Sequence, residues 1–411
     1  STTGACGQMT ILLVLNSGSS SIKYELFDMN SLRSVATGIV EKIGEASGRQ
    51  ACRIFRDDGE TVTRTTEQSI ADHRAGLNHI VETLSATGLI SDPSNLNGVG
   101  HRVVHGGEAF REPALLNQQV LAAIRAQAPL APLHNPANLL GIEVALAAFP
   151  NVPQVAVFDT AFHQTIPRHA YLYAIPYDYY TRLGVRRYGF HGTSHYFVAQ
   201  AAADFLQQKL DALRLITIHL GNGASAAAID RGQCVDTSMG LTPLEGLMMG
   251  TRSGDIDPAI LPFLAHRDSL TLAELDEMLN QQSGLKAICG ENDMREILQR
   301  AEQGDDRAGL AVQMYAYRIK KYLGAYLAVL GGADAVIFTA GIGENSPQIR
   351  ALACAGLEEL GIVLDATKNV TLNRGVREIQ ATGSKTRILV VPTDEELEIA
   401  RQTLECISSQ C

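Results

Sequence analysis

Short apolar runs alternate along the chain with longer stretches in which apolar residues recur every three or four positions. The short runs end at polar or glycine-rich residues, as buried strands do, whereas the longer spacing is that of amphipathic helices. Such an alternation predicts an α/β fold. The clearest predicted strands are Ile11–Leu15, Val155–Phe158, Leu215–Leu220, Ala335–Thr339 and Ile388–Val391. The clearest predicted helices are Asp306–Leu330 and Thr193–Leu210, the second capped by Thr193 and Ser194.

One strand–turn–strand pattern occurs twice, about half a chain apart. The stretch LVLNSGSSSIKYELFD begins at Leu13 and LITIHLGNGASAAAID begins at Leu215. Aligning Leu15 with Leu220 places Gly18 on Gly223 and Ser20 on Ser225, which predicts two homologous halves that each open with a β-hairpin. Turns of Gly, Ser and Asn bring backbone N–H groups close to an anion. Either turn alone would be an ordinary tight turn, but the pair suggests a polyphosphate held between two domains.

The bulk composition narrows the class of protein. A chain of 411 residues with 45% hydrophobic and 19% charged residues predicts two or three globular domains. Because the sequence has no long Pro/Gly/Ser-rich linker, these domains are expected to lie close against one another. A net charge of −10 argues against a broad nucleic-acid surface. Seven scattered cysteines without a CxxC pair indicate a reducing cytosol. No apolar stretch is long enough to span a membrane, and residues 1–8 are expected to be an extension before a start at Met9.

Two motifs place an isolated charge beside an apolar run. In GHRVVHGG, Arg102 lies between apolar neighbours, so it needs a phosphate or carboxylate as partner, although an internal salt bridge would also satisfy it. In VAVFDTAFH, Asp159 follows a buried strand, where a carboxylate can serve Mg²⁺ or proton handling, or can simply cap a helix.

Two glycine-rich loops carry further candidate residues. In RRYGFHGTSH, His191 lies between Phe190 and Gly192, and the surrounding glycines favour close approach of a ligand over a purely structural histidine. In GLMMGTRSGDIDP, a loop broken by glycines presents Arg252, which could stabilise a phosphoryl group in transfer. Asp255 and Asp257 could instead neutralise that arginine.

Weaker signals complete the set. Lys23, on the strand that returns from the first turn, could reach a phosphate or could be a solvated surface lysine. The stretch PLHNP (132–136) is a rigid turn whose apolar members could line a pocket. VIFTAGIGENS (336–346) lacks the third glycine of a dinucleotide motif but suits a nucleotide lying over glycine backbone. ENDMR (291–295) offers an acid and a base for ribose and adenine. P-loop, protein-kinase, HExxH and GxSxG motifs are missing from the sequence.

Together these stretches resemble the acetate kinase family, within the superfamily of acetate and sugar kinases, Hsp70 and actin. The resemblance covers essentially Met9–Ala400. It is carried, in chain order, by NSGSSSIKY, GHRVVHGG, FDTAFH, YGFHGTSH, HLGNGAS, MGLTPLEGLMMGTRSGDIDP and TAGIGEN.

The resemblance implies an α/β, two-domain actin-like ATPase (ribonuclease H-like) fold, with a duplicated ββαβαβα core and an active-site cleft between the domains. Residues 9–158 and about 394–411 would form the N-terminal acyl-substrate and Mg²⁺ domain, and residues 159–393 the C-terminal nucleotide-binding domain. A cytoplasmic homodimer that binds neither nucleic acid nor membrane is expected.

The resemblance also implies roles for single residues. The catalytic positions are Asp159, His191 and Arg252, and Arg102 grips the acyl carboxylate while Val104, Leu133 and Phe190 surround its methyl group. Asn16 and Glu395 are the metal positions, with Glu396 adjacent to the second. The nucleotide-binding positions are Lys23, His219, Leu220, Gly221, Asn222, Gly223, Asp293, Met294, Arg295, Gly341, Ile342, Gly343, Glu344 and Asn345.

The implied reaction is reversible: ATP and acetate give ADP and acetyl phosphate, with Mg²⁺, or Mn²⁺ as the alternative, on the phosphates. Direct in-line transfer is expected, stabilised by Arg252 and His191. Acetate is already ionised at neutral pH, so Asp159 is expected to organise the metal more than to take a proton. Valine at position 104 favours acetate over propionate. The rival functions are a propionate or butyrate kinase and an Hsp70/actin-like nucleotide switch.

Overall fold

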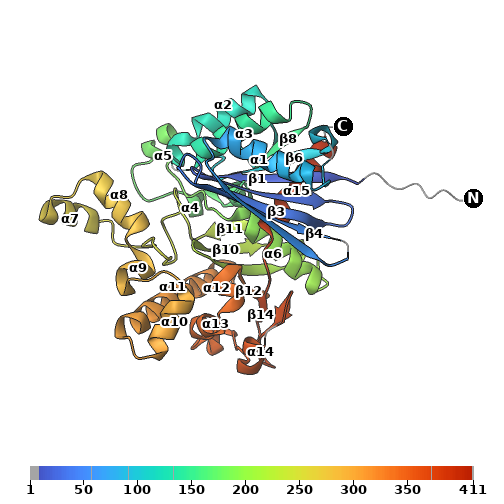
Figure 1. Ribbon diagram of the computed structural model, residues 1–411. Helices are drawn as coiled ribbons and strands as arrows, with labels where there is room; N and C mark the ends of the chain where they lie inside the picture. Colours follow the sequence, from blue (N-terminus) through green and yellow to red (C-terminus); the bar gives the residue numbers. More distant parts are fainter. Residues whose placement is uncertain (1–8, 57, 91, 133, 372, 410–411) are drawn as a thin grey trace, which may run out of the picture. The chain divides into compact units, whose positions relative to one another are not determined.

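The computed structural model describes residues 9–56, 58–90, 92–132, 134–371 and 373–409, and these form two compact units. The first unit runs to Ala161 and also contains the chain from Asp394 onward, and the second is Phe162–Thr393 (Figure 1). Asp159 therefore belongs to the first unit. In the part of the chain that is described, no helix is long and apolar enough to span a membrane.

The first unit is built on an eight-stranded sheet of order β5-β4-β3-β2-β1-β6-β8-β7. Strand β1 is buried on both faces, so it reads as a continuous apolar run, whereas the outer strand β5 is almost entirely exposed and polar. The strands are β1 (Ile11–Ser17), β2 (Ser21–Asp28), β3 (Arg33–Glu41), β4 (Gly48–Phe55), β5 (Thr61–Gln68), β6 (Gly98–Val103), β7 (Ala114–Leu115) and β8 (Gln154–Phe158).

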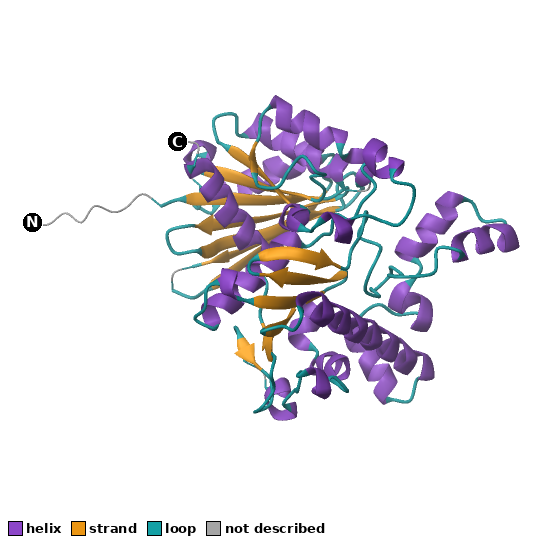
Figure 2. Cartoon of the chain, turned by 180° about the vertical axis from the view of Figure 1, so that it is seen from behind, coloured by secondary structure: helices purple, strands orange, loops and turns teal. Residues whose placement is uncertain are grey.

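Helices cover both faces of this sheet (Figure 2). Leu77 and Ile80 of α1 and Val144 of α3 pack with one side of β1 and β2, and Ile399 and Ala400 of α15 pack on the other. The helices are α1 (His73–Ala86), α2 (Gln118–Ala126), α3 (Asn135–Ala148) and α15 (Glu395–Ser408), with short 3-10 turns at Pro93–Asn95 and Ala128–Leu130.

The second unit is built on a six-stranded sheet of order β11-β10-β9-β12-β14-β13. Strands β9, β10 and β12 are almost wholly buried, which explains their uninterrupted apolar sequences. The strands are β9 (Arg214–Leu220), β10 (Ala224–Asp230), β11 (Gln233–Thr237), β12 (Ala335–Thr339), β13 (Arg377–Glu378) and β14 (Arg387–Val390).

The helices of the second unit lie between and around these strands. They are α4 (Arg168–Tyr171), α5 (Asp178–Leu183), α6 (Gly192–Phe205), α7 (Ile260–Asp268), α8 (Leu272–Gln281), α9 (Gly284–Cys289), α10 (Met294–Glu302), α11 (Asp306–Leu330), α12 (Ala340–Asn345), α13 (Pro347–Cys354) and α14 (Ala366–Val370). Short 3-10 turns lie at Ala161–Thr165, Leu210–Ala212 and Glu358–Leu360.

The two sheets share one strand arrangement. The order β3-β2-β1-β6-β8 in the first unit matches β11-β10-β9-β12-β14 in the second. In the first sheet, β1, β2 and β3 pair antiparallel with one another in that order, and β6 and β8 run parallel to β1. In the second sheet, β9, β10 and β11 do the same, and β12 and β14 run parallel to β9. This confirms the predicted duplication, the two hairpins and the five predicted strands. Helix α6 comes after the strands of the first unit in the chain but belongs to the second unit, where it packs on β9. Helix α15 comes after the strands of the second unit but belongs to the first, where it packs on β1.

The predicted helix at Asp306–Leu330 is confirmed as α11, but the prediction for Thr193–Leu210 is partly wrong. Helix α6 begins at Gly192, its N-cap is His191, and it ends at Phe205. Thr193 and Ser194 are buried within its first turn, and the Ser194 hydroxyl bonds His219. After Phe205 the chain turns back, with Gln207 at a φ of 53°, so that Leu206 and Leu210 pack on the core.

Candidate active site

In the first unit, Arg102 and Asp159 form a two-point ion pair. Arg102 lies on β6 and Asp159 directly follows β8, which pairs with β6 in parallel with Val103 opposite Phe158. Nε of Arg102 donates to Oδ1 of Asp159 at 3.0 Å, and Nη2 donates to Oδ2 at 2.7 Å. The Asp159 side chain is 2% exposed and that of Arg102 is 25% exposed. Asp159, and then Glu395, raise the pKa of Arg102 despite its burial, so an internal salt bridge does satisfy this arginine.

Glu395, the first residue of α15, lies beside this pair. Burial raises the pKa of its carboxyl from 4.5 to about 7; Arg102 lowers it, and Asp159 and Glu396 raise it further. Among the residues that the structure describes, Oε2 of Glu395 is buried without a hydrogen-bond partner. A buried carboxylate oxygen of this kind is suited to a cation.

Asn16 and Lys23 lie opposite each other in the first hairpin, at the end of β1 and the start of β2. Both line a cavity of about 400 Å³, together with Glu25 and Glu396. Burial raises the pKa of Glu25 to about 7, and Glu396 contributes to that shift. The structure therefore brings the predicted residues Asn16 and Lys23 together with Glu396, and brings Glu395 together with Arg102 and Asp159.

The loop after β6 is held by two asparagines of α3 that the sequence did not single out for function. Asn138 accepts from the N–H of Val104 at 3.1 Å and donates to the carbonyl of Ser17 at 2.8 Å, so it links this loop to the first hairpin. Asn135, from the PLHNP stretch, bonds both the N–H and the carbonyl of His105. Val104 is half-buried. Leu133, predicted for the acyl pocket, lies outside the described residues.

In the second unit, His191 stands at the turn of the second hairpin. It has a left-handed backbone, with a φ of 56°, as the N-cap of α6. Its Nδ1 is 2.9 Å from the Ser225 hydroxyl on β10, and its ring stacks on that of His219 with centroids 4.2 Å apart. Phe190, predicted for the acyl pocket, precedes it in this unit and is buried.

Arg252 reaches the same turn from its loop. A methyl group placed on Gly223 would lie 3.0 Å from Nη2 of Arg252 and 3.4 Å from Nε2 of His191, so the two side chains converge over this glycine. Nη1 of Arg252 donates to the carbonyl of Pro243 at 2.6 Å, and burial lowers the pKa of the guanidinium. Asp255 is bonded instead by Tyr322 and the N–H of Gly246.

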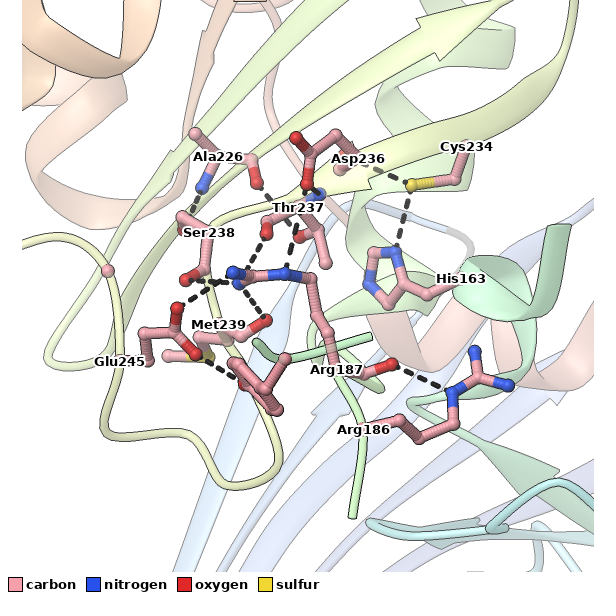
Figure 3. A network of polar contacts seen from close by, with 12 residues as sticks. His163, Arg186, Arg187, Ala226, Cys234, Asp236, Thr237, Ser238, Met239 and Glu245 are labelled. Atoms are coloured by element: carbon pink, nitrogen blue, oxygen red, sulfur yellow. Dashed lines mark hydrogen bonds and ion pairs between the residues drawn. The ribbon is translucent and has the colours of Figure 1, made fainter. Parts of the chain in front are cut away.

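Arg187 fixes the segment that contains Pro243, to which Arg252 is bonded. Figure 3 shows Arg187 among its partners Thr237, Ser238, Met239 and Glu245. Its Nη1 donates to three successive carbonyls, those of Thr237, Ser238 and Met239, at 2.9 to 3.1 Å. Its Nη2 donates to Glu245 at 2.7 Å. Arg187 thus ties the loop that leads to His191 to the segment that carries Pro243. Its position in RRYGFHGTSH was visible in the sequence, but its structural partners were not.

A cavity of about 830 Å³ opens beside the second hairpin. It is lined by predicted nucleotide-binding residues: Gly221, Asn222, Asp293, Met294, Arg295, Gly341, Ile342 and Asn345. The sequence did not single out the polar side chains that α10 and α13 add: Gln299, Glu302 and Gln348. Asp293 caps α10 and is paired with Arg295 at 2.5 Å, which lowers its pKa to about 2.

The other predicted nucleotide residues of this unit are not among the residues that line this cavity. Leu220 is buried in β9, and Gly343 packs against the end of β12. Nδ1 of His219 is 2.8 Å from the Ser194 hydroxyl. Glu344 accepts from the N–H of Thr393 at 3.3 Å.

The donor set suits a polyphosphate with a hard divalent cation. Arginines and a histidine match phosphate oxygens, and carboxylate and amide oxygens match the cation. No cluster of three or more His, Cys, Asp or Glu side chains able to hold a metal occurs among the described residues. A cation would therefore be held by few protein ligands and completed by phosphate and water, as is common for Mg²⁺.

Comparisons with known proteins agree over nearly the whole chain. The Acetokinase family model matches residues 11–401. Acetate kinase of Nitratidesulfovibrio vulgaris (strain DP4) is 52% identical over 398 residues, covering 96% of this chain and 99% of that protein. The crystal structure of Porphyromonas gingivalis acetate kinase is 44% identical with a TM-score of 0.91, covering 97% of this chain and 100% of that one.

A propionate kinase from Francisella tularensis subsp. tularensis SCHU S4 is 40% identical with a TM-score of 0.90, again covering 97% of this chain and 100% of its own. These likenesses extend through both units and include the duplicated actin-like ATPase core. The chain belongs to the acetokinase family, whose members are phosphotransferases that use ATP, a divalent metal and a carboxyl group as acceptor.

Proposed function

We propose that this chain catalyses the reversible transfer of the γ-phosphoryl group of ATP to acetate, giving acetyl phosphate and ADP. The single observation that carries the proposal is the convergence of Arg252 Nη2 and His191 Nε2 over Gly223. Two preorganised donors over a backbone turn can stabilise the charge on the equatorial oxygens of a phosphoryl group. The catalytic groups are then Asp159, His191 and Arg252.

The second unit binds the nucleotide in this proposal. Its 830 Å³ cavity has the size of a cofactor site and is lined by polar side chains and by glycines. Gly221, Asn222, Arg295 and Gly341 are the principal contacts, and Lys23 of the first unit reaches the phosphates as a point charge.

The first unit supplies the acyl and metal residues. Arg102, held from one side by Asp159, presents its remaining nitrogen to the acetate carboxylate, and Val104, Leu133 and Phe190 surround the methyl group. Asn16, Glu395 and Asp159 would hold Mg²⁺, which would supply charge neutralisation at the phosphate oxygens. The partnerless buried oxygen of Glu395 supports this assignment over Glu396.

The transfer step needs no general base. Acetate has a pKa near 4, so it is ionised at neutral pH. One of its oxygens attacks the γ-phosphorus, the bond to the bridging oxygen breaks in line, and ADP leaves with that electron pair. Asp159 then orients Arg102 and the metal rather than accepting a proton. The enzyme is proposed to work as a cytoplasmic homodimer.

Hydroxylamine trapping of acyl phosphate tests the function. Purified protein receives Mg·ATP with acetate, propionate, butyrate or no acid. Strong product with acetate and less with propionate supports the proposal. A propionate preference would keep the mechanism and overturn the acetate assignment. Bound ATP without acyl phosphate from any acid would favour a nucleotide switch instead.

A further inference from the structure

His191 is the end of a chain of polar side chains that runs back into the second unit. Its Nδ1 lies 2.9 Å from Oγ of Ser225 on β10. The same oxygen lies 2.7 Å from Nε2 of His195, one turn further along α6. Nδ1 of His195 lies 2.7 Å from the hydroxyl of Thr217 on β9. Ser225, His195 and Thr217 are all fully buried.

The donor count restricts where hydrogens can be. A serine hydroxyl has one hydrogen to donate, and Ser225 bridges two imidazole nitrogens. It can therefore donate to only one of them, and the other must carry a hydrogen of its own. His195 is neutral, because burial, followed by the nearby His163 and His219, lowers its pKa well below 6.5.

Two arrangements satisfy these rules. In the first, Thr217 donates to His195, His195 donates through Nε2 to Ser225, and Ser225 donates to Nδ1 of His191. Neutral His191 then carries its hydrogen on Nε2, the nitrogen on the side of Gly223 and Arg252. In the second, every bond is reversed and Nδ1 of His191 carries a hydrogen, as it does both in the protonated side chain and in the other neutral tautomer. Of the two neutral forms, only the first arrangement places the hydrogen on Nε2. The chain can thus support an Nε2 hydrogen in both charge states of His191.

We propose that Ser225 and His195 are positioning residues for phosphoryl transfer, which anchor Nδ1 of His191 so that its Nε2 hydrogen faces the transferred group. The proposal rests on the role assigned above to His191. Other groups also face this imidazole: the ring of His219 is stacked on it, and Arg252 lies across Gly223. Ser225 Oγ lies within hydrogen-bond distance of Nδ1, at 2.9 Å, and so can orient that nitrogen.

The geometry also suits a positioning role because the backbone conformation and the ring neighbours of His191 restrict its side chain. Its left-handed φ of 56° at the N-cap of α6 sets the direction of the side chain, and the stacked His219 restricts ring tilt. What remains free is which nitrogen carries the hydrogen, and the proposal assigns to neutral His191 the arrangement in which Ser225 donates to Nδ1. Groups that orient an imidazole in this way typically change activity by roughly 10–100-fold when removed.

The principal test compares Ser225→Ala and Thr217→Val with Thr386→Val. The control removes an equally buried threonine hydroxyl of the same unit, one that donates to the carbonyl of Ala333 at 3.0 Å instead of belonging to the chain. For Ser225→Ala we expect kcat to fall by roughly 10–100-fold while KM for ATP is unchanged. Thr217→Val should show a smaller loss of the same kind, Thr386→Val none, and Ser225→Cys partial rescue.

A double-mutant cycle separates this inference from the role of His191 itself. If Ser225 acts through His191, adding Ser225→Ala to His191→Ala should lower kcat no further. Additive losses, or an unchanged kcat in Ser225→Ala, would overturn the inference while leaving the proposed function standing. Full activity of His191→Ala would overturn the assigned role of His191 and the inference with it, although trapping could still detect acyl phosphate.

Nitrogen-15 NMR of histidine-labelled protein gives a readout that packing alone would not change. The signals of His191 are identified by their loss in His191→Gln. We expect a protonated Nε2 and an unprotonated Nδ1 in the neutral wild-type side chain, and a mixture of both tautomers in Ser225→Ala. An Nε2 tautomer that persists in Ser225→Ala would contradict the inference.

Discussion

Asp159 holds Arg102 through Nε and Nη2 and leaves Nη1 unengaged by the pair. The pair is 57 residues apart in sequence and is formed because β6 and β8 are adjacent parallel strands. A guanidinium gripped along one edge keeps one orientation, so its third nitrogen is presented in a fixed direction. The carboxylate that would otherwise be read as a base therefore orients Arg102, the arginine proposed to bind the acyl carboxylate.

Arg102→Lys should lower kcat/KM for acetate by about 10–100-fold, because a hydrogen bond to a charged group is worth about 1.5–3 kcal/mol. A lysine keeps the charge but cannot bond Asp159 and a substrate carboxylate with one planar fork. KM for ATP should be unchanged. The control is Arg125→Lys, in an exposed pair with Glu143. Equal effects of the two changes would contradict the role of Arg102.

Asp159→Asn should raise the Mg²⁺ concentration needed for half-maximal activity, because an amide is a weaker cation ligand than a carboxylate. It should also raise KM for acetate, since Arg102 loses its charged partner. Activity is measured across a Mg²⁺ titration, and the free energy of unfolding is measured in parallel. Lost activity with an unchanged Mg²⁺ dependence would instead favour a proton-transfer role.

Glu395 should make the metal-free protein less stable as pH rises. Its folded-state pKa of about 7 is raised from 4.5, so the folded state binds the extra proton between these values. The stability is therefore fully present below about pH 4.5 and is lost as pH rises through about 7. Metal-free Glu395→Gln should accordingly melt higher than wild type at pH 8.

Added Mg²⁺ should remove that advantage, because the cation stabilises the ionised wild-type carboxylate. Glu398→Gln is the matched control, since burial raises the pKa of the Glu398 carboxyl as well and Gln402 bonds it. Its pH-dependent gain should persist with Mg²⁺. The measurement is the melting temperature at pH 6 and pH 8, with and without Mg²⁺. A Glu395→Gln gain that Mg²⁺ does not change would remove Glu395 from the metal site.

Gly223→Ala should lower kcat by roughly 10²-fold, the loss typical when one preorganised donor is displaced. The added methyl would press on Nη2 of Arg252 at 3.0 Å and on Cε1 of His191 at 3.3 Å. Gly324→Ala in α11 is the control, because its methyl would meet nothing within 4 Å, and alanine is the better helix former. Steady-state kinetics of both variants measure the change in kcat, and melting curves show whether either variant is destabilised. A Gly223→Ala enzyme with wild-type kcat would show that Arg252 and His191 need no such approach.

Val104→Ala should improve the use of propionate relative to acetate by roughly 10-fold or more, because one methylene in an apolar pocket is worth about 1–3 kcal/mol. Activity on acetate should change little. The ratio of kcat/KM for the two acids measures this directly. Leu139→Ala, in a hydrophobic core cluster of the same unit, is the control for a general loss of packing. An unchanged ratio in Val104→Ala would place the methyl pocket elsewhere.

The elements were predictable where local pattern alone decides them. Strand β12 was predicted with its observed bounds, and the hairpin turns with Gly18 and Gly223, because burial on both faces produces an unbroken apolar run. Helix α11 was equally clear, with Asp305 before it and Gly331 after it. The N-terminus of α6 was missed because His191 takes a left-handed conformation, and because the Ser194 hydroxyl, which looks like a cap, bonds the buried His219 instead.

The sequence by itself determined the α/β class, the duplicated hairpins, the family and the residues worth testing, because local apolar patterns and short motifs are sufficient to recognise each of them. Only the tertiary structure decided which of those residues meet. Strand order and helix placement decide the pairing of Arg102 with Asp159 and the chain from His191 through Ser225 to Thr217. They also bring Gln299 and Gln348 to the cavity beside the second hairpin. Contacts between residues distant along the chain follow from packing, which no short stretch of sequence contains.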